Sequence, residues 1–128
     1  MPQGNPPFEI IFTDINEIGM GSPYNTCNIE LKGTHIRLPQ ASWQDKYAWA
    51  GDSGTLVLIK WASHEPAFQF FIIDTNSGQI QESKKINGCL KTIETTGNKI
   101  KYSKFLFDKE KSAAGKLCCE TDWEYEII

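Results

Sequence analysis

The chain has few of the residues from which catalytic and metal sites are built. It contains only two histidines, His35 and His64, and neither has a carboxylate at a spacing that matches a known catalytic pattern. Its four cysteines form no Cys-x-x-Cys pair, the spacing that structural zinc sites commonly use. We therefore expect no metal, no cofactor and no catalytic residue, and we expect that the chain is not an enzyme.

Long apolar runs are also missing. The longest, residues 56–59 and 68–73, are far shorter than the roughly 20 residues of a membrane-spanning helix. Residues 1–7 carry three prolines and no basic residue, which predicts a flexible lead-in and not a signal peptide. The cysteines are then interpreted as reduced thiols, and the expected location is cytoplasmic, without membrane contact. Residues 8–128 are expected to form a single β domain.

What the chain does contain is a succession of short β-type runs separated by turn residues. Parallel neighbours need a dozen or more connecting residues, so connections this short predict mainly antiparallel pairing. Residues 55–61 and 67–73 are apolar on both faces and are expected in the middle of the structure, covered on both sides. The predicted fold is all-β and mainly antiparallel, either a β-sandwich or a half-closed barrel.

At most one or two short helices are expected. Residues 39–46 are compatible with one or two helical turns, and residues 108–117 with a short helix capped by Asp108. Strands are expected at 34–38, at 47–50 and, closing the chain, at 120–128.

Residues 51–54 read Gly-Asp-Ser-Gly, which is similar to part of the nucleophile signature of trypsin-like serine proteases. The similarity covers four residues only, because Thr55 and Leu56 follow where that signature continues with glycine and proline. Those enzymes also need a histidine and an aspartate held between two barrels. We interpret residues 51–54 as a hairpin turn.

Charge is distributed unevenly along the chain. Residues 84–116 hold nine lysines against three acidic residues, whereas residues 117–128 hold four acidic residues and no basic one. The lysine-rich segment contains no arginine and few aromatic residues, and the whole chain has a net charge of −3. Binders of single-stranded nucleic acid combine basic grooves with stacking rings, so a nucleic-acid partner is not expected.

Acidic residues alternate with larger uncharged ones near the C-terminus. The acidic residues are Glu120, Asp122, Glu124 and Glu126. In a strand, this spacing places the four carboxylates on one face and the aromatic residues on the other. One interpretation is a solvated edge strand whose charges prevent edge-to-edge aggregation. The other is a docking surface for a basic protein partner, which Asp14 and Glu17 in an early loop would join.

Small size, negative charge and the lack of catalytic motifs give the chain a profile that resembles bacterial toxin-immunity proteins. These proteins neutralise a cognate toxin by covering its active site. The resemblance implies a protein partner, with a basic nuclease domain as the expected class, because carboxylates can imitate the phosphates that a nuclease binds. The alternative is a small-ligand-binding β-barrel or a structural subunit, with Trp43, Trp49, Trp61 and residues 68–71 lining a cavity.

Overall fold

The computed structural model describes residues 8–17, 25–34, 36–50, 54–62, 67–107 and 117–127, without the side chains of residues 17, 105–107 and 117–121. Predictions about residues 1–7, His35, His64, residues 51–53 and residues 108–116 lie outside this description. Ten strands occur in the described residues: β1 (Glu9–Glu17), β2 (Asn25–Lys32), β3 (Ser42–Ala50), β4 (Thr55–Ala62), β5 (Ala67–Asp74), β6 (Ile80–Glu82), β7 (Ile86–Asn87), β8 (Cys89–Thr96), β9 (Lys99–Phe107) and β10 (Leu117–Glu126).

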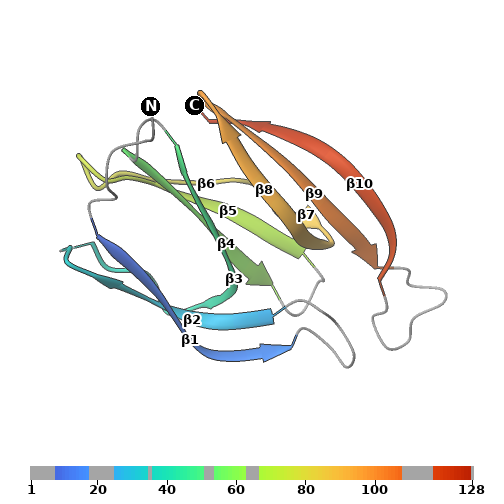
Figure 1. Cartoon of the computed structure of the whole chain (residues 1–128), viewed down its shortest axis with the longest axis horizontal. Helices are drawn as coiled ribbons and strands as arrows, with labels where there is room; N and C mark the ends of the chain where they lie inside the picture. The colour runs from blue at the N-terminus through green and yellow to red at the C-terminus, as the bar shows by residue number, and fades with distance from the viewer. Residues whose placement is uncertain are drawn as a thin grey trace.

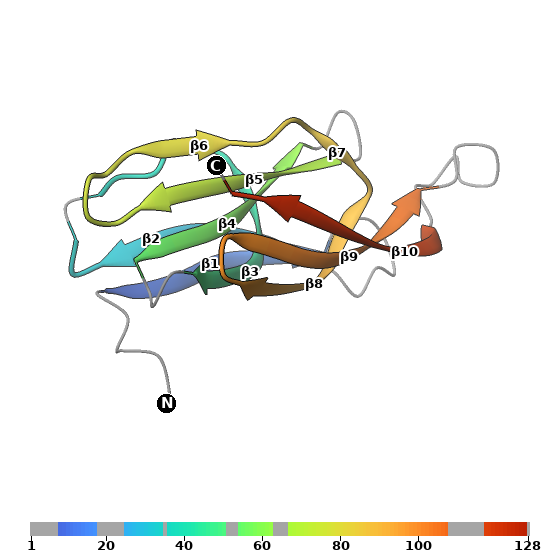
Figure 2. The same ribbon diagram turned by 90° about the horizontal axis from the view of Figure 1, so that it is seen from above.

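The strands form two antiparallel sheets. The large sheet has the order β1-β2-β3-β4-β5-β6, and β7 also pairs with β5. The small sheet has the order β10-β9-β8. In Figure 1, β4 and β5 pass between the β1–β2 hairpin at the lower left and the small sheet at the upper right. Figure 2 shows the same arrangement from above, with β6 and β8 on opposite sides of the view.

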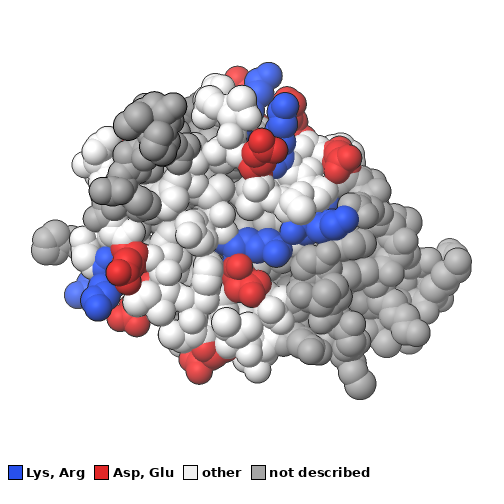
Figure 3. Space-filling view, in the orientation of Figure 1, with Lys and Arg blue, Asp and Glu red and all other residues white. Residues whose placement is uncertain are grey.

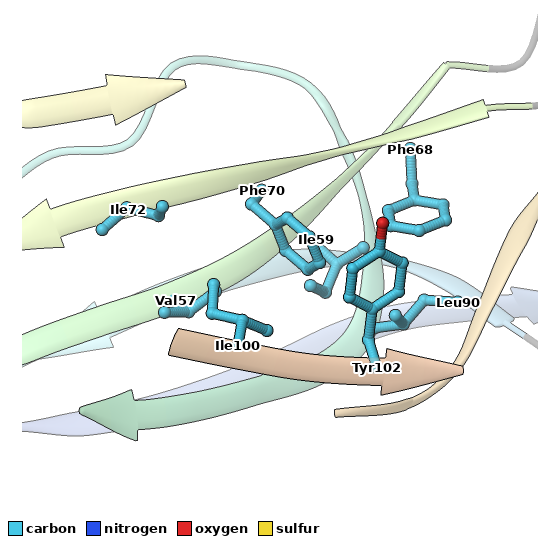
Figure 4. Close-up of a cluster of buried hydrophobic side chains, with 8 residues drawn as sticks. All are labelled: Val57, Ile59, Phe68, Phe70, Ile72, Leu90, Ile100 and Tyr102. Carbon is cyan, nitrogen blue, oxygen red and sulfur yellow. The ribbon is translucent and has the colours of Figure 1, made fainter. Parts of the chain in front are cut away.

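The core lies on both faces of β4 and β5, as their sequences predict. Val57 and Ile59 of β4 join a cluster that contacts the small sheet through Ile100 and Tyr102 of β9. Figure 4 shows this cluster, with the Tyr102 ring directed from β9 toward the rings carried by β5. The opposite face of the two strands carries a second cluster. Its buried members are Phe8, Cys27, Trp43, Leu56, Leu58, Phe71 and Ile73.

The second cluster depends on the short pairing between β2 and β3 in the large sheet. These strands pair through only two residue pairs, Thr26 with Gln44 and Cys27 with Trp43. The β1–β2 hairpin can then turn its apolar residues toward the face of β4 and β5 that the small sheet does not cover. A strand covered on both faces has no polar alternation, which explains the continuous apolar runs.

The predicted all-β, mainly antiparallel fold is confirmed, and it is sandwich-like and not a closed barrel. The predicted helical turns at residues 39–46 are wrong, because β3 already begins at Ser42. Tertiary packing decides this segment: Trp43 is buried against the Phe71 ring, with centroids 5.2 Å apart. The predicted strand at residues 34–38 is also wrong, since residues 36–38 have no regular structure.

Candidate functional site

The outer face of the small sheet carries Asp122, Glu124 and Glu126, three of the six residues predicted to bind a partner. Residues that pair across strands point to the same side, so the register places outward side chains in rows. Glu94, Lys101 and Glu124 form the middle row. The flanking rows are Thr92, Ser103 and Asp122 on one side, and Thr96, Lys99 and Glu126 on the other.

This face is hollowed at its centre. The hollow has a volume of about 610 Å³. Ile93, Tyr102 and Trp123 contribute to its lining, together with six outward polar residues: Thr92, Glu94, Lys101, Ser103, Asp122 and Glu124. The hydroxyls of Thr92 and Ser103 hydrogen-bond to each other on its floor. Three of the lining residues are acidic and one is basic, so the hollow favours a positively charged group.

Lysines of β9 lie beside the acidic residues of β10. The sequence prediction did not include this proximity. The Nζ atom of Lys99 lies 3.7 Å from Oε1 of Glu124, and both side chains are about half exposed. Asp122 stands opposite the uncharged Ser103. In Figure 3, acidic and basic side chains are interspersed over the upper part of the molecule, where Figure 1 places the ends of β8, β9 and β10. The face is therefore acidic by a small excess and not uniformly so.

The structure brings some of the predicted binding residues together. Asp122, Glu124 and Glu126 are exposed on one face of β10. Glu120 belongs to the same strand, but its side chain lies outside the described part, as does that of Glu17 at the end of β1.

Asp14 does not join this face. It lies in β1, and Figure 1 shows β1 and β10 on opposite sides of the molecule. Asp14 occupies a bulge with a φ of 52°, and its carboxylate accepts a hydrogen bond of 2.8 Å from the side-chain amide of Asn28. This aspartate therefore shapes the edge of the large sheet, since aspartate tolerates a left-handed backbone better than most residues.

The inner face of β10 carries aromatic residues, as alternation predicts. Tyr125 packs on the Phe70 ring at 5.4 Å, whereas Trp123 remains 52% exposed. The Nζ atom of Lys104 lies 5.1 Å from the centroid of the Trp123 ring. Lys104 is itself only 6% exposed, and burial lowers the pKa of its ammonium group.

Glu94 and Lys101 are the site residues that sequence reasoning missed. The sequence contains a signal for part of this arrangement, because the turn residues Thr96-Gly97-Asn98 favour the β8–β9 hairpin that pairs them. The position of β10 beside β9 had no comparable signal, since residues 108–116 separate the two strands in sequence.

The aromatic residues proposed to line a ligand cavity belong to the two core clusters, in which Trp49 and Trp61 are partly buried. Trp43, Phe68 and Phe70 are buried, and Trp49 packs on the Phe8 ring at 5.3 Å. Within the described ranges, no group of three or more His, Cys, Asp or Glu residues is placed to hold a metal ion. The same ranges include no helix of the length and apolar character required to cross a bilayer.

Comparisons with protein-family models, with curated proteins and with solved structures found no match to this chain.

Proposed function

We propose that the chain is a binding protein that blocks a basic protein partner with the outer face of its small sheet. The observation that carries the proposal is the hollow in which Glu94, Asp122 and Glu124 lie around Lys101. A nuclease gathers lysine and arginine to hold phosphates, and carboxylates on a shallow concave surface offer it a substitute. The action would be that of a toxin-immunity protein, which the overall profile of the chain resembles.

Electrostatics of this kind acts mainly on the rate and selectivity of association. Complementary charge steers a partner into place and disfavours wrong partners more than it adds affinity. The lysines of β9 reduce the net charge of the face, so removing one of them is expected to strengthen the attraction. Lys101 is the informative position because it lies inside the hollow.

The first test uses the immobilised chain to capture partners from a lysate of the cells that produce it. The test variant is Asp122→Asn/Glu124→Gln, and the matched control is Glu9→Gln/Glu30→Gln, which makes the same charge change at exposed sites of β1 and β2. We expect the wild type and the control variant to capture a basic protein that the test variant does not capture. We also expect the wild-type chain to inhibit the activity of that protein. Equal capture by the test variant, or a captured protein whose activity is unaffected, would refute the proposal.

The second test measures association rates with the captured partner. Lys101→Gln should raise the association rate constant severalfold at low salt, and the gain should disappear at high salt. Lys32→Gln, at an exposed position of β2, removes the same charge far from the hollow and should change the rate little. An association rate that Lys101→Gln leaves unchanged or lowers would show that the hollow does not receive the basic partner.

A further inference from the structure

The edge strands in the described residues differ in how easily they could pair with a further strand. Side-chain hydrogen bonds from β3 and β8 join the edge of β8 to the large sheet, through Gln44 with Leu90 and Thr95 with Trp49. β6 and β7 have only three and two residues, and β1 is interrupted by the bulge at Asp14. Short and bulged edges resist further pairing.

β10 is the exception. It has ten residues, and its register with β9 is continuous from Cys119 to Glu126. It is the terminal strand of the small sheet, and within the described residues no strand pairs with its other edge. An unpaired edge presents alternate backbone N–H and C=O groups to an incoming strand.

An apolar hollow lies along the inner side of this edge. Its volume is about 660 Å³, and Ile86 of β7, Tyr102 of β9 and Tyr125 of β10 give it an apolar lining, with residues 81–84 at its rim. The side-chain amide of Gln81 donates a 3.3 Å hydrogen bond to the Tyr125 hydroxyl and so ties the two sheets together there. The half-exposed Trp123 lies on the same face of β10.

Charge decides which strand this edge accepts. A second copy of the chain pairing antiparallel through β10 would bring two rows of carboxylates beside each other, and like charges on adjacent strands are destabilising. A strand with lysine or arginine at alternate positions would place a cation beside Asp122, Glu124 and Glu126. The same row that repels a second copy therefore selects a basic strand.

We propose that β10 binds an extended segment of a basic protein by strand addition. Basic side chains of that segment would lie beside the carboxylates of the outer face, and the alternate apolar side chains would face Trp123 and the inner hollow. Main-chain hydrogen bonds then provide affinity and alternate side chains provide specificity. The inference rests on the proposed function, because it states how the acidic sheet holds its partner.

The experiment uses synthetic eight-residue peptides in which lysine alternates with valine. Two further peptides are methylated on backbone nitrogens, one at every lysine and the other at every valine. Each loses one alternate set of backbone N–H donors, and the side-chain charges are unchanged. A fourth peptide has glutamate in place of lysine. Binding to the full chain is measured by titration calorimetry at low salt, and amide hydrogen exchange of β10 is followed in the same complexes.

Strand addition predicts that one N-methylated peptide loses about tenfold or more in affinity while the other keeps most of it, because only one set of N–H groups faces β10. It also predicts slower amide exchange in β10 when the unmodified peptide is bound. The glutamate peptide should not bind.

The failures of the two proposals can be told apart. Equal affinity of all three lysine peptides, or no binding by any of them, would overturn strand addition, and the capture experiment above would still decide whether the outer face blocks a basic protein. Equal binding of the glutamate and lysine peptides would overturn charge selection at this sheet, on which both proposals depend. The variant Asp122→Asn/Glu124→Gln should weaken the unmodified peptide about tenfold, and Glu9→Gln/Glu30→Gln should not.

Discussion

The side-chain amide of Gln44 forms two hydrogen bonds with the backbone of Leu90 and so joins the two sheets. Its nitrogen donates to the Leu90 carbonyl and its oxygen accepts from the Leu90 N–H, each at 3.1 Å. Gln44 is fully buried, and its amide supplies one donor and one acceptor as a neighbouring strand would. These two bonds satisfy backbone groups at the edge of β8 that would otherwise be buried without partners.

Gln44→Leu is therefore expected to lower the free energy of unfolding by roughly 2–5 kcal/mol, because the buried N–H of Leu90 loses the Gln44 oxygen and the Leu90 carbonyl keeps only the weak contact with the Cys89 thiol at 3.8 Å. Urea denaturation followed by circular dichroism measures this. Gln81→Leu is the matched control, since the half-buried Gln81 side chain bonds a side-chain hydroxyl, that of Tyr125, and not a buried backbone, and it should cost less than about 1 kcal/mol. Equal losses in the two variants would show that the Gln44 bonds do not hold the sheets together.

Cys27 and Cys89 should be unreactive in the folded protein. Both are free and buried, and burial raises the pKa of each thiol from 9.0 to about 12. The thiolate is the nucleophile, so at pH 8 iodoacetamide should not modify either residue until urea is added. Peptide mapping by mass spectrometry measures this, and rapid native labelling of either cysteine would contradict its burial.

The same cysteines predict a loss of stability at alkaline pH. Their folded pKa lies above the unfolded value, so the stabilisation is complete below pH 9 and is lost as the pH rises toward 12. Each thiol contributes a slope of up to about 1.4 kcal/mol per pH unit in that range. Cys27→Ala/Cys89→Ala should flatten the dependence of the free energy of unfolding on pH between 9 and 12, whatever its cost at neutral pH.

Lys104→Met should stabilise the protein at neutral pH. Burial lowers the pKa of Lys104 in the folded state, so the unfolded chain binds this proton more readily and the lysine costs stability at pH values below its folded pKa. Methionine removes that cost and forfeits a cation–π contact with Trp123 worth about 0.5–1 kcal/mol. We expect a higher midpoint in thermal or urea unfolding at neutral pH than in the wild type.

Lys101→Met is the control for that gain, because Lys101 lies on the same strand with an exposed side chain. Exposed charge pairs in sheets contribute little, so this variant should leave stability unchanged or lower it slightly. If both variants changed stability alike, the burial of Lys104 would not be the cause.

Neutralising the carboxylates of β10 should let the chain pair with itself. In Asp122→Asn/Glu124→Gln/Glu126→Gln the open edge keeps its length and loses its like charges, so dimers or larger species should form at concentrations where the wild type is monomeric. Light scattering during size-exclusion chromatography measures this. A triple variant as monomeric as the wild type would show that the charges do not protect the edge.

Local sequence determined the central strands and the faces that they bury. The continuous apolar runs at residues 55–61 and 67–73 predicted strands covered on both sides, and the two core clusters lie on those two faces. A period of two assigns every side chain of a strand to one face once the strand is recognised, so the exposed carboxylates of β10 were predictable as well.

Only the tertiary structure decided which strands became neighbours. It placed β10 beside the lysines of β9, put Asp14 on the other side of the molecule, and made residues 42–46 a strand by burying Trp43 and Gln44. These outcomes depend on pairings between residues far apart in the chain. Local alternation fixes a side chain's face but carries no information about which strand will lie beside it.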